Sequence, residues 1–497
     1  MDLTGLLTVI SIVASCFFIY STWDKMYRRC DLPPGPTPLP LFGTLLHIKQ
    51  GELVSSLMKL WKQYGPVYTL YFGSRPVVVI CGYGAVKEAL VNQAEEFGAR
   101  GSLPTLEKFT QGYGLSLSNG ERWKIMRSFT IKILKSFGFG SKSIEGKIQE
   151  EALYLVEEIR TFKGLPLNPS NILMSSIANV LCSLIFGDRF EYRDERFFRL
   201  LEIVTESFSL ASSPWGQLYS ILPTVMQYIP GPHHKIIHNS EEMAAFIFER
   251  VKTSQESLDA ASPRHFIDSF LIKMDQEKEI PNTEFHLRNL LITTHNLFIA
   301  GIETVSTTLR YSLLIILKYQ EIQAKLHEEI DRVIGREFLP KLEDRAHMPF
   351  TQAVICEVQR FCDVSPLNVP HKVTRDTQFR GYLIPKGTEI YPLLCTVHRD
   401  PEQFSTPYTF NPNHFLDENG QFKKNDALMP FSAGKRICPG ESLARMELFI
   451  FLTTILQKFT LTSKTEFTES DRPGHIAPRM AGFLNAPIDY NVSFIPR

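Results

Sequence analysis

The fold is decided by residues 430–449, which read PFSAGKRICPGESLARMELF. Cys438 stands there between a basic, glycine-containing loop and a stretch with helical periodicity. Pro439 suits the first turn of a helix, and Lys435 and Arg436 precede the thiol, so its pKa is expected to be low. A nucleophilic cysteine would need a histidine base that nothing nearby supplies, whereas an axial metal ligand needs only the thiolate. The alternative is an inert, buried cysteine.

Composition indicates a large globular protein. The chain has 497 residues, of which 44% are hydrophobic and 21% charged. Lys+Arg and Asp+Glu are equal at 53 each, so charge gives no argument for a nucleic-acid partner. The 8 cysteines show no CxxC or Cys/His ligand spacing, which argues against a disulfide framework and a structural zinc site.

The N-terminus carries a membrane signal. The run 3–23 is uncharged and about as long as a helix needs to cross a bilayer. Basic residues at 25–29 follow this run, so the positive-inside rule keeps the rest of the chain in the cytosol. A cleaved signal peptide is the alternative. We expect an anchor over 1–24, a basic and proline-rich hinge over 25–43, and one catalytic domain over 44–497, with a PxxP ligand as the other interpretation of the prolines.

The remaining pattern predicts a mainly α protein with small β-sheets, an α+β fold in a single large domain. Stretch 65–90 alternates and is β-branched, which predicts a small antiparallel sheet leading into a helix. From about residue 120 the periodicity is mostly helical. Further strands are expected over 371–393, with a hairpin turn at Gly381, and over 480–496.

One long helix is predicted from Thr283 to Lys318, about 50 Å at helical rise. Its middle is apolar nearly all round, so we expect it to thread the core. Ala300 and Gly301 would leave space beside it, and Thr304 can turn its hydroxyl toward preceding carbonyls. Glu303 would need a partner or water there; the alternative is that it faces solvent.

Four motifs resemble those of the cytochromes P-450. FSAGKRICPG (431–440) resembles the haem-binding loop of this family, and AGIET (300–304) the oxygen-activation motif of its central helix. EVQR (357–360) resembles its ExxR pair, and WKIMR (123–127) its WxxxR element. The likeness follows family order along essentially the whole chain, and is nearest to the vertebrate microsomal family numbered two.

This resemblance implies haem b as cofactor, O2 as co-substrate and Cys438 as iron ligand. Thr304 and Glu303 would be the alcohol and acid that supply protons. Residues expected to contact the haem or its propionates are Arg100, Trp123, Arg127, Ala300, His371, Phe431, Arg436 and Gly440. Residues expected to face substrate are Leu103, Phe208, Asn296, Leu297, Val364, Leu367, Val369 and Phe483.

The resemblance also implies a structural triad of Glu357, Arg360 and His414. Histidine replaces the family's arginine at 414, which puts the strength of the triad at high pH in doubt. Ile302 and Val305 stand where threonines are common in relatives, so this side of the central helix is expected to be drier.

Electrons must come from outside, because no flavin or dinucleotide fingerprint is present; GYGL (112–115) and GFGS (138–141) lack the third glycine. The resemblance implies NADPH, acting through a membrane-bound flavoprotein reductase, with cytochrome b5 as a further partner. Candidate docking residues are Arg122, Lys132, Lys135, Lys435 and Arg445, with a solvated face as the alternative. The apolar stretch 214–231 is a candidate second membrane contact.

These features predict a monooxygenase acting on a lipophilic substrate, which could be a xenobiotic, a fatty acid or a steroid. The protein is expected in the endoplasmic reticulum membrane as a single-pass protein with its catalytic domain in the cytosol. A haem-thiolate isomerase or dehydratase, which rearranges peroxides without external electrons, is the first alternative. A non-enzymatic haem sensor or carrier is the second.

Overall fold

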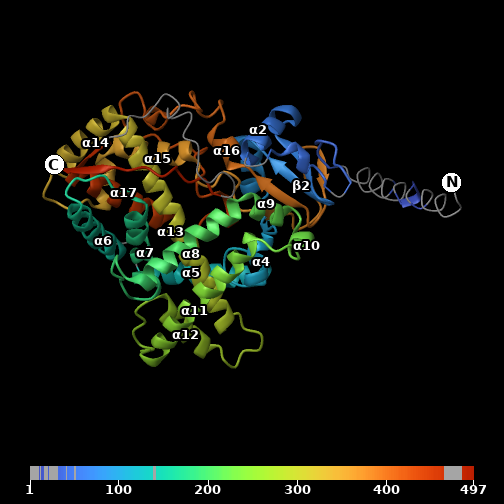
Figure 1. Ribbon diagram of the computed structural model, residues 1–497, viewed down its shortest axis with the longest axis horizontal. Helices are drawn as coiled ribbons and strands as arrows, with labels where there is room; N and C mark the ends of the chain where they lie inside the picture. The colour runs from blue at the N-terminus through green and yellow to red at the C-terminus, as the bar shows by residue number, and fades with distance from the viewer. Residues whose placement is uncertain are drawn as a thin grey trace.

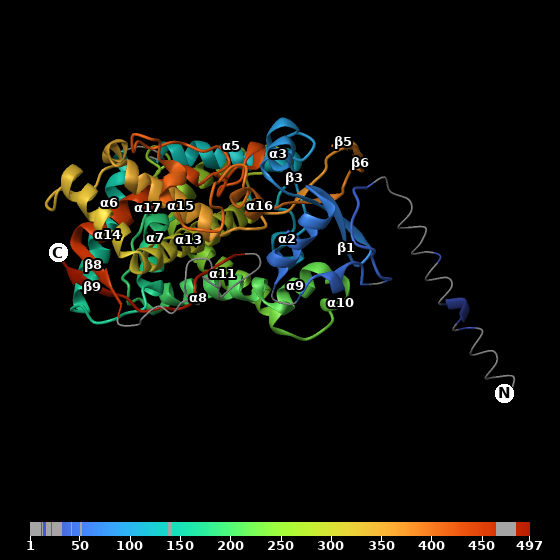
Figure 2. The ribbon, with the colours of Figure 1, turned by 90° about the horizontal axis from the view of Figure 1, so that it is seen from above.

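Helix α13 (Leu287–Lys318) runs through the middle of the molecule, with α5 on one side of it and α8 on the other (Figures 1 and 2). The computed structural model describes residues 11, 13–15, 21, 32–40, 42–49, 52–137, 142–463 and 484–497. The other α-helices are α2 (Leu53–Tyr64), α3 (Tyr83–Lys87), α4 (Pro104–Thr110), α5 (Gly120–Ser136), α6 (Lys142–Thr161), α7 (Ser170–Ile185), α8 (Glu195–Ser212), α9 (Pro214–Ile221), α10 (Pro223–Met226), α11 (Lys235–Glu256), α12 (Phe266–Gln276), α14 (Gln320–Val333), α15 (Pro349–Cys362), α16 (Leu394–His398) and α17 (Glu441–Lys458).

The predicted central helix is confirmed, but it begins at Leu287 rather than Thr283. His286 ends the preceding turn, because its side chain accepts a hydrogen bond from the Asn289 amide and caps the helix. Within the described part of the chain, α13 is the one helix long and apolar enough to span a membrane, yet 78% of its apolar window is buried. It is therefore a core helix. The predicted anchor over 1–24 lies almost entirely outside the described residues.

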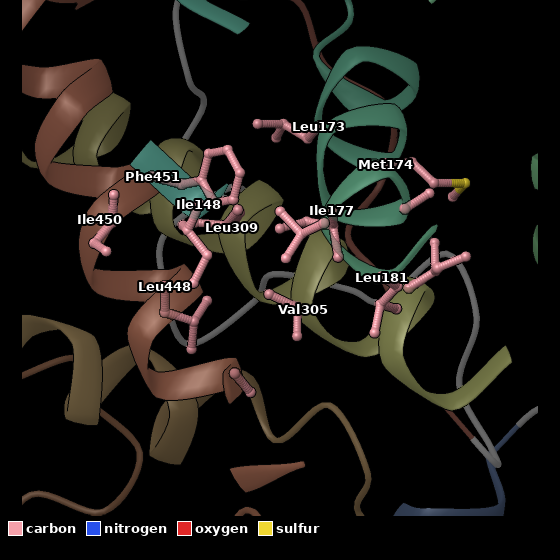
Figure 3. Packing of buried hydrophobic residues seen from close by; sticks show 14 of the residues in the cluster. Ile148, Leu173, Met174, Ile177, Leu181, Val305, Leu309, Leu448, Ile450 and Phe451 are labelled. Atoms are coloured by element: carbon pink, nitrogen blue, oxygen red, sulfur yellow. The ribbon is translucent and has the colours of Figure 1, made fainter. Parts of the chain in front are cut away.

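Helix α7 packs directly on α13. Figure 3 shows Ile177 and Leu181 of α7 directed toward Val305 and Leu309 of α13. A Cβ on Gly301 would lie 2.5 Å from Leu181 Cδ1. The space that Gly301 was expected to leave beside the helix is therefore filled by Leu181.

The two unusual residues of the central motif lie in the same apolar contact. Ile302 is fully buried and Val305 is 4% exposed. Both belong to the hydrophobic core cluster that joins α7, α13 and α17. This side of the helix is therefore apolar where these two residues lie.

The predicted strands form three small sheets. Their bounds are β1 (Val67–Phe72), β2 (Arg75–Ile80), β3 (Ala99–Arg100), β4 (His371–Lys372), β5 (Thr377–Phe379), β6 (Tyr382–Ile384), β7 (Glu389–Pro392), β8 (Phe459–Thr462) and β9 (Ser493–Pro496). The largest has the order β1-β2-β7-β4-β3, and β5 with β6 and β8 with β9 make the other two. The β1–β2 pair is antiparallel as predicted. The parallel pairing of β2 with β7 was not predicted, because it joins segments about 300 residues apart.

The predicted hairpin turn in the second strand-rich stretch is confirmed. Arg380 and Gly381 connect β5 to β6, with φ angles of 49° and 86°. Positive φ at both turn residues is the geometry of the tight hairpin turn that matches strand twist. The third predicted stretch contributes β9, although its first residues, 480–483, lie outside the described residues.

The described part of the proline-rich stretch is fastened to the sheet. The Thr69 hydroxyl and amide of β1 donate to the carbonyls of Pro33 and Pro34, at 2.8 and 3.0 Å. A Cβ on Gly35 would lie 1.9 Å from Thr69 O, so this close approach requires glycine. Pro33, Pro36 and Pro38 are buried. These prolines are therefore part of the folded body rather than a surface ligand for another protein.

A buried ion-pair cluster ties α15 to the segment before the cysteine loop. Glu357 and Arg360 are both fully buried and form two hydrogen bonds, at 2.6 and 2.7 Å. Arg360 also donates to the carbonyls of residues 398, 407 and 409. This bidentate geometry confirms the pairing predicted for the ExxR motif.

His414 completes this cluster through both of its ring nitrogens. Its Nε2 accepts from the Thr406 amide at 3.2 Å, so the ring hydrogen lies on Nδ1 and is donated to Glu357 at 3.2 Å. No charge on the histidine is needed for either bond.

Glu357→Ala leaves the buried Arg360 guanidinium unpaired, and we expect it to lower the free energy of unfolding by about 3–5 kcal/mol. The matched control is Glu157→Ala, which breaks an i,i+3 pair whose side chains, Glu157 and Arg160, are 66% and 51% exposed. We expect that control to cost less than about 1 kcal/mol. Chemical unfolding of the full-length holoprotein, followed by circular dichroism, measures both. Equal losses would contradict the assignment.

Candidate active site

The cysteine loop is held by backbone contacts around one glycine. Gly434 has φ of 70°, and a Cβ there would lie 1.7 Å from the carbonyl oxygen of Leu90. Every other residue would clash with that backbone, so Gly434 lets the loop lie against the segment after α3. The Cys438 amide then donates to Phe431 O at 2.9 Å. Gly440 has no such constraint, since its φ is −90°.

The surroundings of the thiol differ from expectation. Burial raises the pKa of Cys438, and the Gly440 N–H with the guanidiniums of Arg127 and Arg100 only partly oppose this. Helix α17 begins at Glu441, beyond Pro439, and the Glu441 carboxylate also raises the pKa. The predicted low pKa is therefore wrong for the polypeptide alone.

Arg100, Arg127 and Arg436, the guanidinium cluster, lie around this loop with Trp123 and His371. The Arg436 guanidinium stacks 3.8 Å from the centre of the Trp123 ring, and that of Arg127 lies 5.7 Å from it. Arg127 donates to the carbonyl of Ile437 at 2.6 Å. The structure thus brings together all five residues predicted to hold propionates.

The state of His371 follows from its contacts. Burial lowers the pKa of His371, and the Arg100 guanidinium lowers it further. Nδ1 donates to Phe97 O at 2.7 Å, and Nε2 accepts from Arg100 Nη1 at 2.7 Å. His371 is therefore neutral and helps to position Arg100.

The guanidinium cluster lacks anions. Among the described residues, none of its three members has a carboxylate within ion-pair distance. Burial lowers the pKa of Arg100 to about 10 and that of Arg436 to about 9, and Arg100 Nε has no hydrogen-bond partner. Ala300 is exposed in the middle of α13, although its helix is otherwise mostly buried. A planar group with two carboxylates, such as haem, fits this donor set and this uncovered face.

The ligand set at the sulfur points the same way. Within the described part of the chain, no group of three or more metal-ligating side chains occurs. Cys438 would thus be a single protein ligand, which suits a metal whose remaining ligands come with its own cofactor.

Asn119 is a cluster residue that sequence reasoning missed. Its Oδ1 accepts from the Arg100 amide at 2.7 Å and from Arg436 Nη2 at 2.8 Å, and its Nδ2 donates to Arg100 O at 3.1 Å. Asn119 stands at the N-cap of α5, but its side chain does not cap that helix. The one hint in the sequence was that this asparagine stands shortly before the WxxxR element, at a position where an N-cap is expected.

Thr304 and Glu303 lie on different faces of α13. The Thr304 hydroxyl donates to Ala300 O at 2.8 Å, which confirms the predicted bond to the preceding turn. Glu303 is fully buried, so the solvent-facing alternative is wrong. Its carboxylate accepts from Thr205 at 3.3 Å and Thr307 at 3.2 Å. Burial raises the pKa of Glu303, against a smaller lowering by Arg310 and these hydroxyls.

The predicted substrate residues come from several elements. Phe208 of α8 and Val364 pack against Leu484 and Ala486, two residues that sequence reasoning missed. Leu367 belongs to the core cluster of α2, β1 and β2. Leu103 is buried, Leu297 and Val369 are half-buried, and Phe483 lies outside the described residues.

Asn296 holds a loop. Its Oδ1 accepts from the amides of Leu115 and Ser116, at 3.0 and 3.1 Å. Asn289, two turns earlier on α13, accepts from the Gly114 amide at 2.8 Å. The two asparagines therefore fasten the loop between α4 and α5 onto the central helix.

The predicted docking cations divide into two groups. Arg122 pairs with Glu284 at 2.6 Å, Arg445 with Glu441 at 2.9 Å, and Lys435 with Glu95. Lys132 and Lys135 are exposed on α5 and have no ion pair among the described residues. Helix α5 lies on the face opposite to α8 and α11 (Figure 2).

Comparison with known proteins decides the family. The cytochrome P-450 family model matches residues 33–493. The chain belongs to the cytochrome P-450 family. It is 52% identical to cytochrome P-450 2G1 of Rattus norvegicus over 498 residues, covering 100% of both chains. It is 53% identical to cytochrome P-450 2F2 of Mus musculus over 457 residues, 92% of each, and 49% identical to cytochrome P-450 2A13 of Homo sapiens over 495 residues, 99% of each.

Membership establishes the reaction class. This cytochrome P-450 is a haem-thiolate monooxygenase that uses haem b, O2 and electrons from NADPH delivered by a redox partner. A lipophilic substrate and an endoplasmic reticulum membrane location accompany this class. The expected cofactors and fold class are confirmed.

Arg436→Met removes one cation of the guanidinium cluster while keeping an unbranched apolar stem, and we expect haem loss to become about tenfold faster or more, since hydrogen bonds to charged groups are strong. Arg436→Lys keeps a charge and should fall between Met and the unchanged protein. Arg196→Met, at a site 72% exposed, is the control and should not change the rate. Haem transfer to excess apomyoglobin, followed by absorbance, measures it. An unchanged rate in Arg436→Met would remove this residue from the haem site.

Proposed function

We propose that this cytochrome P-450 inserts one oxygen atom from O2 into a xenobiotic, a fatty acid or a steroid. Its electrons would come from NADPH through a flavoprotein reductase. The observation that carries the proposal is a cysteine beside guanidiniums that have no carboxylate partner among the described residues, with an alcohol and an acid at consecutive positions on two faces of the central helix. Those are the parts that such a reaction needs on the two sides of one cofactor.

Cys438 is the proposed iron ligand. Bound haem supplies the oxidising chemistry, and a thiolate ligand favours cleavage of the O–O bond. Arg100, Arg127, Arg436, Trp123 and His371 would hold the propionates. Phe431 and Gly440 would enclose the sulfur, and Ala300 would face the ring.

Thr304 and Glu303 are the proposed proton-supplying pair. The Thr304 hydroxyl is half-buried and donates its hydrogen to Ala300 O, so its oxygen can accept a hydrogen bond from a proton donor. The buried Glu303 carboxyl has a raised pKa, which suits a group that keeps a proton until it is needed. An isomerase or dehydratase needs neither group, so the presence of both favours the monooxygenase.

The proposed substrate surface is mainly apolar. It consists of Leu103, Phe208, Asn296, Leu297, Val364, Leu367, Val369 and Phe483. Contacts of Phe208 and Val364 with Leu484 support a wall made by α8, the turn after α15 and the C-terminal segment. Such a wall favours a lipophilic guest with few polar anchors.

The proposed topology is a single-pass anchor over 1–24, a basic and proline-rich connection over 25–43 whose described prolines pack on the folded body, and a cytosolic catalytic domain over 44–497. Support for a second membrane contact comes from α9, α10 and the turn after them. Trp215 is 40% exposed, Val225 53% and Tyr228 82%. Lipid contact would cover this apolar surface. The docking face for the reductase, and for cytochrome b5 as a further partner, would be centred on Lys132 and Lys135 of α5.

Cys438→Ser tests the iron ligand. We expect the reduced, carbon monoxide-treated variant to lose the red-shifted Soret band that thiolate ligation gives, because an alcohol is a far weaker donor. Cys182→Ala, a change at a buried cysteine of α7, is the control and should keep the band. A serine variant that still hydroxylates normally would show that the ligand is assigned wrongly.

Thr304→Ala tests the proton supply. With NADPH and the reductase, we expect this variant to keep the Soret band but to release more peroxide and less product, with the product formed per NADPH falling about tenfold. Thr304→Ser keeps the hydroxyl and should behave like the unchanged protein. NADPH consumption, peroxide and hydroxylated alkoxycoumarin are measured together. An unchanged product yield in Thr304→Ala would contradict the role of this alcohol.

A further inference from the structure

Thr205 is a polar residue of α8 that none of the family motifs includes. Its hydroxyl lies 3.3 Å from Glu303 Oε2 and 3.5 Å from Met174 Sδ. A hydroxyl has one hydrogen to donate, and a carboxyl oxygen is a much better acceptor than a thioether. The Thr205 hydroxyl therefore donates to Glu303 rather than to Met174, and at 3.3 Å this hydrogen bond is a weak one.

This contact sets the direction in which the acid points. Glu303 Oε1 accepts from Thr307 on its own helix, while Oε2 accepts from Thr205 on another. The carboxyl is thus held between α13 and α8. The Thr304 hydroxyl, which donates to Ala300, lies on the uncovered face instead. Glu303 must turn away from α8 to approach Thr304.

Helix α8 also carries a proposed substrate residue on the same face. Thr205 and Phe208 are three residues apart, so their side chains are neighbours on the helix surface. Phe208 packs against Leu484 and Ala486. Met174 and Leu181 of α7 lie beside α13 in this region (Figure 3). A guest that displaces Phe208 therefore acts on the same helix turn that holds Glu303.

We propose that Thr205 is a positioning residue for the acid: it ties the Glu303 carboxyl to α8, so that proton supply responds to substrate contact with this helix. The inference rests on the proton-supplying role proposed above for Glu303. The proposal adds Thr205 to the residues that serve the reaction, through its hydroxyl group rather than through its packing.

The first measurement is spectroscopic and needs no turnover. Infrared difference spectra on photolysis of carbon monoxide from the reduced full-length protein should show a carboxyl band of Glu303, identified by its loss in Glu303→Gln. Thr205→Val removes one hydrogen bond to that carboxyl, so we expect the band to move to higher frequency. Thr205→Ser keeps the hydroxyl and should leave the band in place. An unmoved band in Thr205→Val would overturn the proposal.

The second measurement is the ratio of hydroxylated alkoxycoumarin to peroxide, with NADPH and the reductase. We expect Thr205→Val to lower this ratio about fivefold, the value of one hydrogen bond, and Thr205→Ser to restore it. Met174→Leu changes the packing around Thr205 without touching the carboxyl, and is the control that should leave the ratio unchanged.

The double variant separates the two proposals. If Thr205 acts through Glu303, Thr205→Val adds no further loss to Glu303→Gln. Additive losses would show that Thr205 works by another route and would overturn the inference alone. A normal ratio in Glu303→Gln would instead reject the proton-supplying role of Glu303, and with it the inference, while the infrared shift would still report the hydrogen bond.

Discussion

Three clustered guanidiniums, two of them buried and none with a carboxylate at ion-pair distance among the described residues, are the constraint on which the rest of the structure depends. Desolvating a cation is costly, and Arg100 and Arg436 are both nearly fully buried. Hydrogen bonds to backbone carbonyls and the stacking of Arg436 on Trp123 lower this desolvation cost but leave the positive charges without a counter-ion. The positive charges of Arg100 and Arg127 also act on the thiol of Cys438, whose pKa they lower. In the proposed site, the haem propionates would supply anions for these guanidiniums and the iron would supply a cation for the sulfur, so the cofactor and the fold would stabilise each other.

Local patterns predicted much of the fold. The apolar run of α13, the β1–β2 hairpin and the turn at Gly381 depend on neighbouring residues, and all three are confirmed. The pairing of β2 with β7 depends on residues far apart, and no local signal indicates it. Gly301 was misjudged for a similar reason, because Leu181 comes from a helix more than 100 residues earlier.

The site shows the same division. The motifs were enough to find Cys438, Arg127, Arg436 and the Glu357–Arg360 pair, whereas Arg100 and His371 came from the family resemblance. Asn119 and Thr205 were missed because each acts through a side chain that another element brings close. The pKa of the thiol was misjudged because burial, which sequence does not display, outweighs the nearby positive charges.

The parallel β2–β7 ladder also bears on how the chain is made. Strand β2 pairs with β1 as soon as both exist, but its other edge waits for Glu389–Pro392. Ribosomes add roughly 5–20 residues each second, so this edge stays open for tens of seconds during synthesis. An open strand edge is prone to join other chains. Translation speed and chaperone access during that interval therefore bear on how much of this protein is recovered in a folded state.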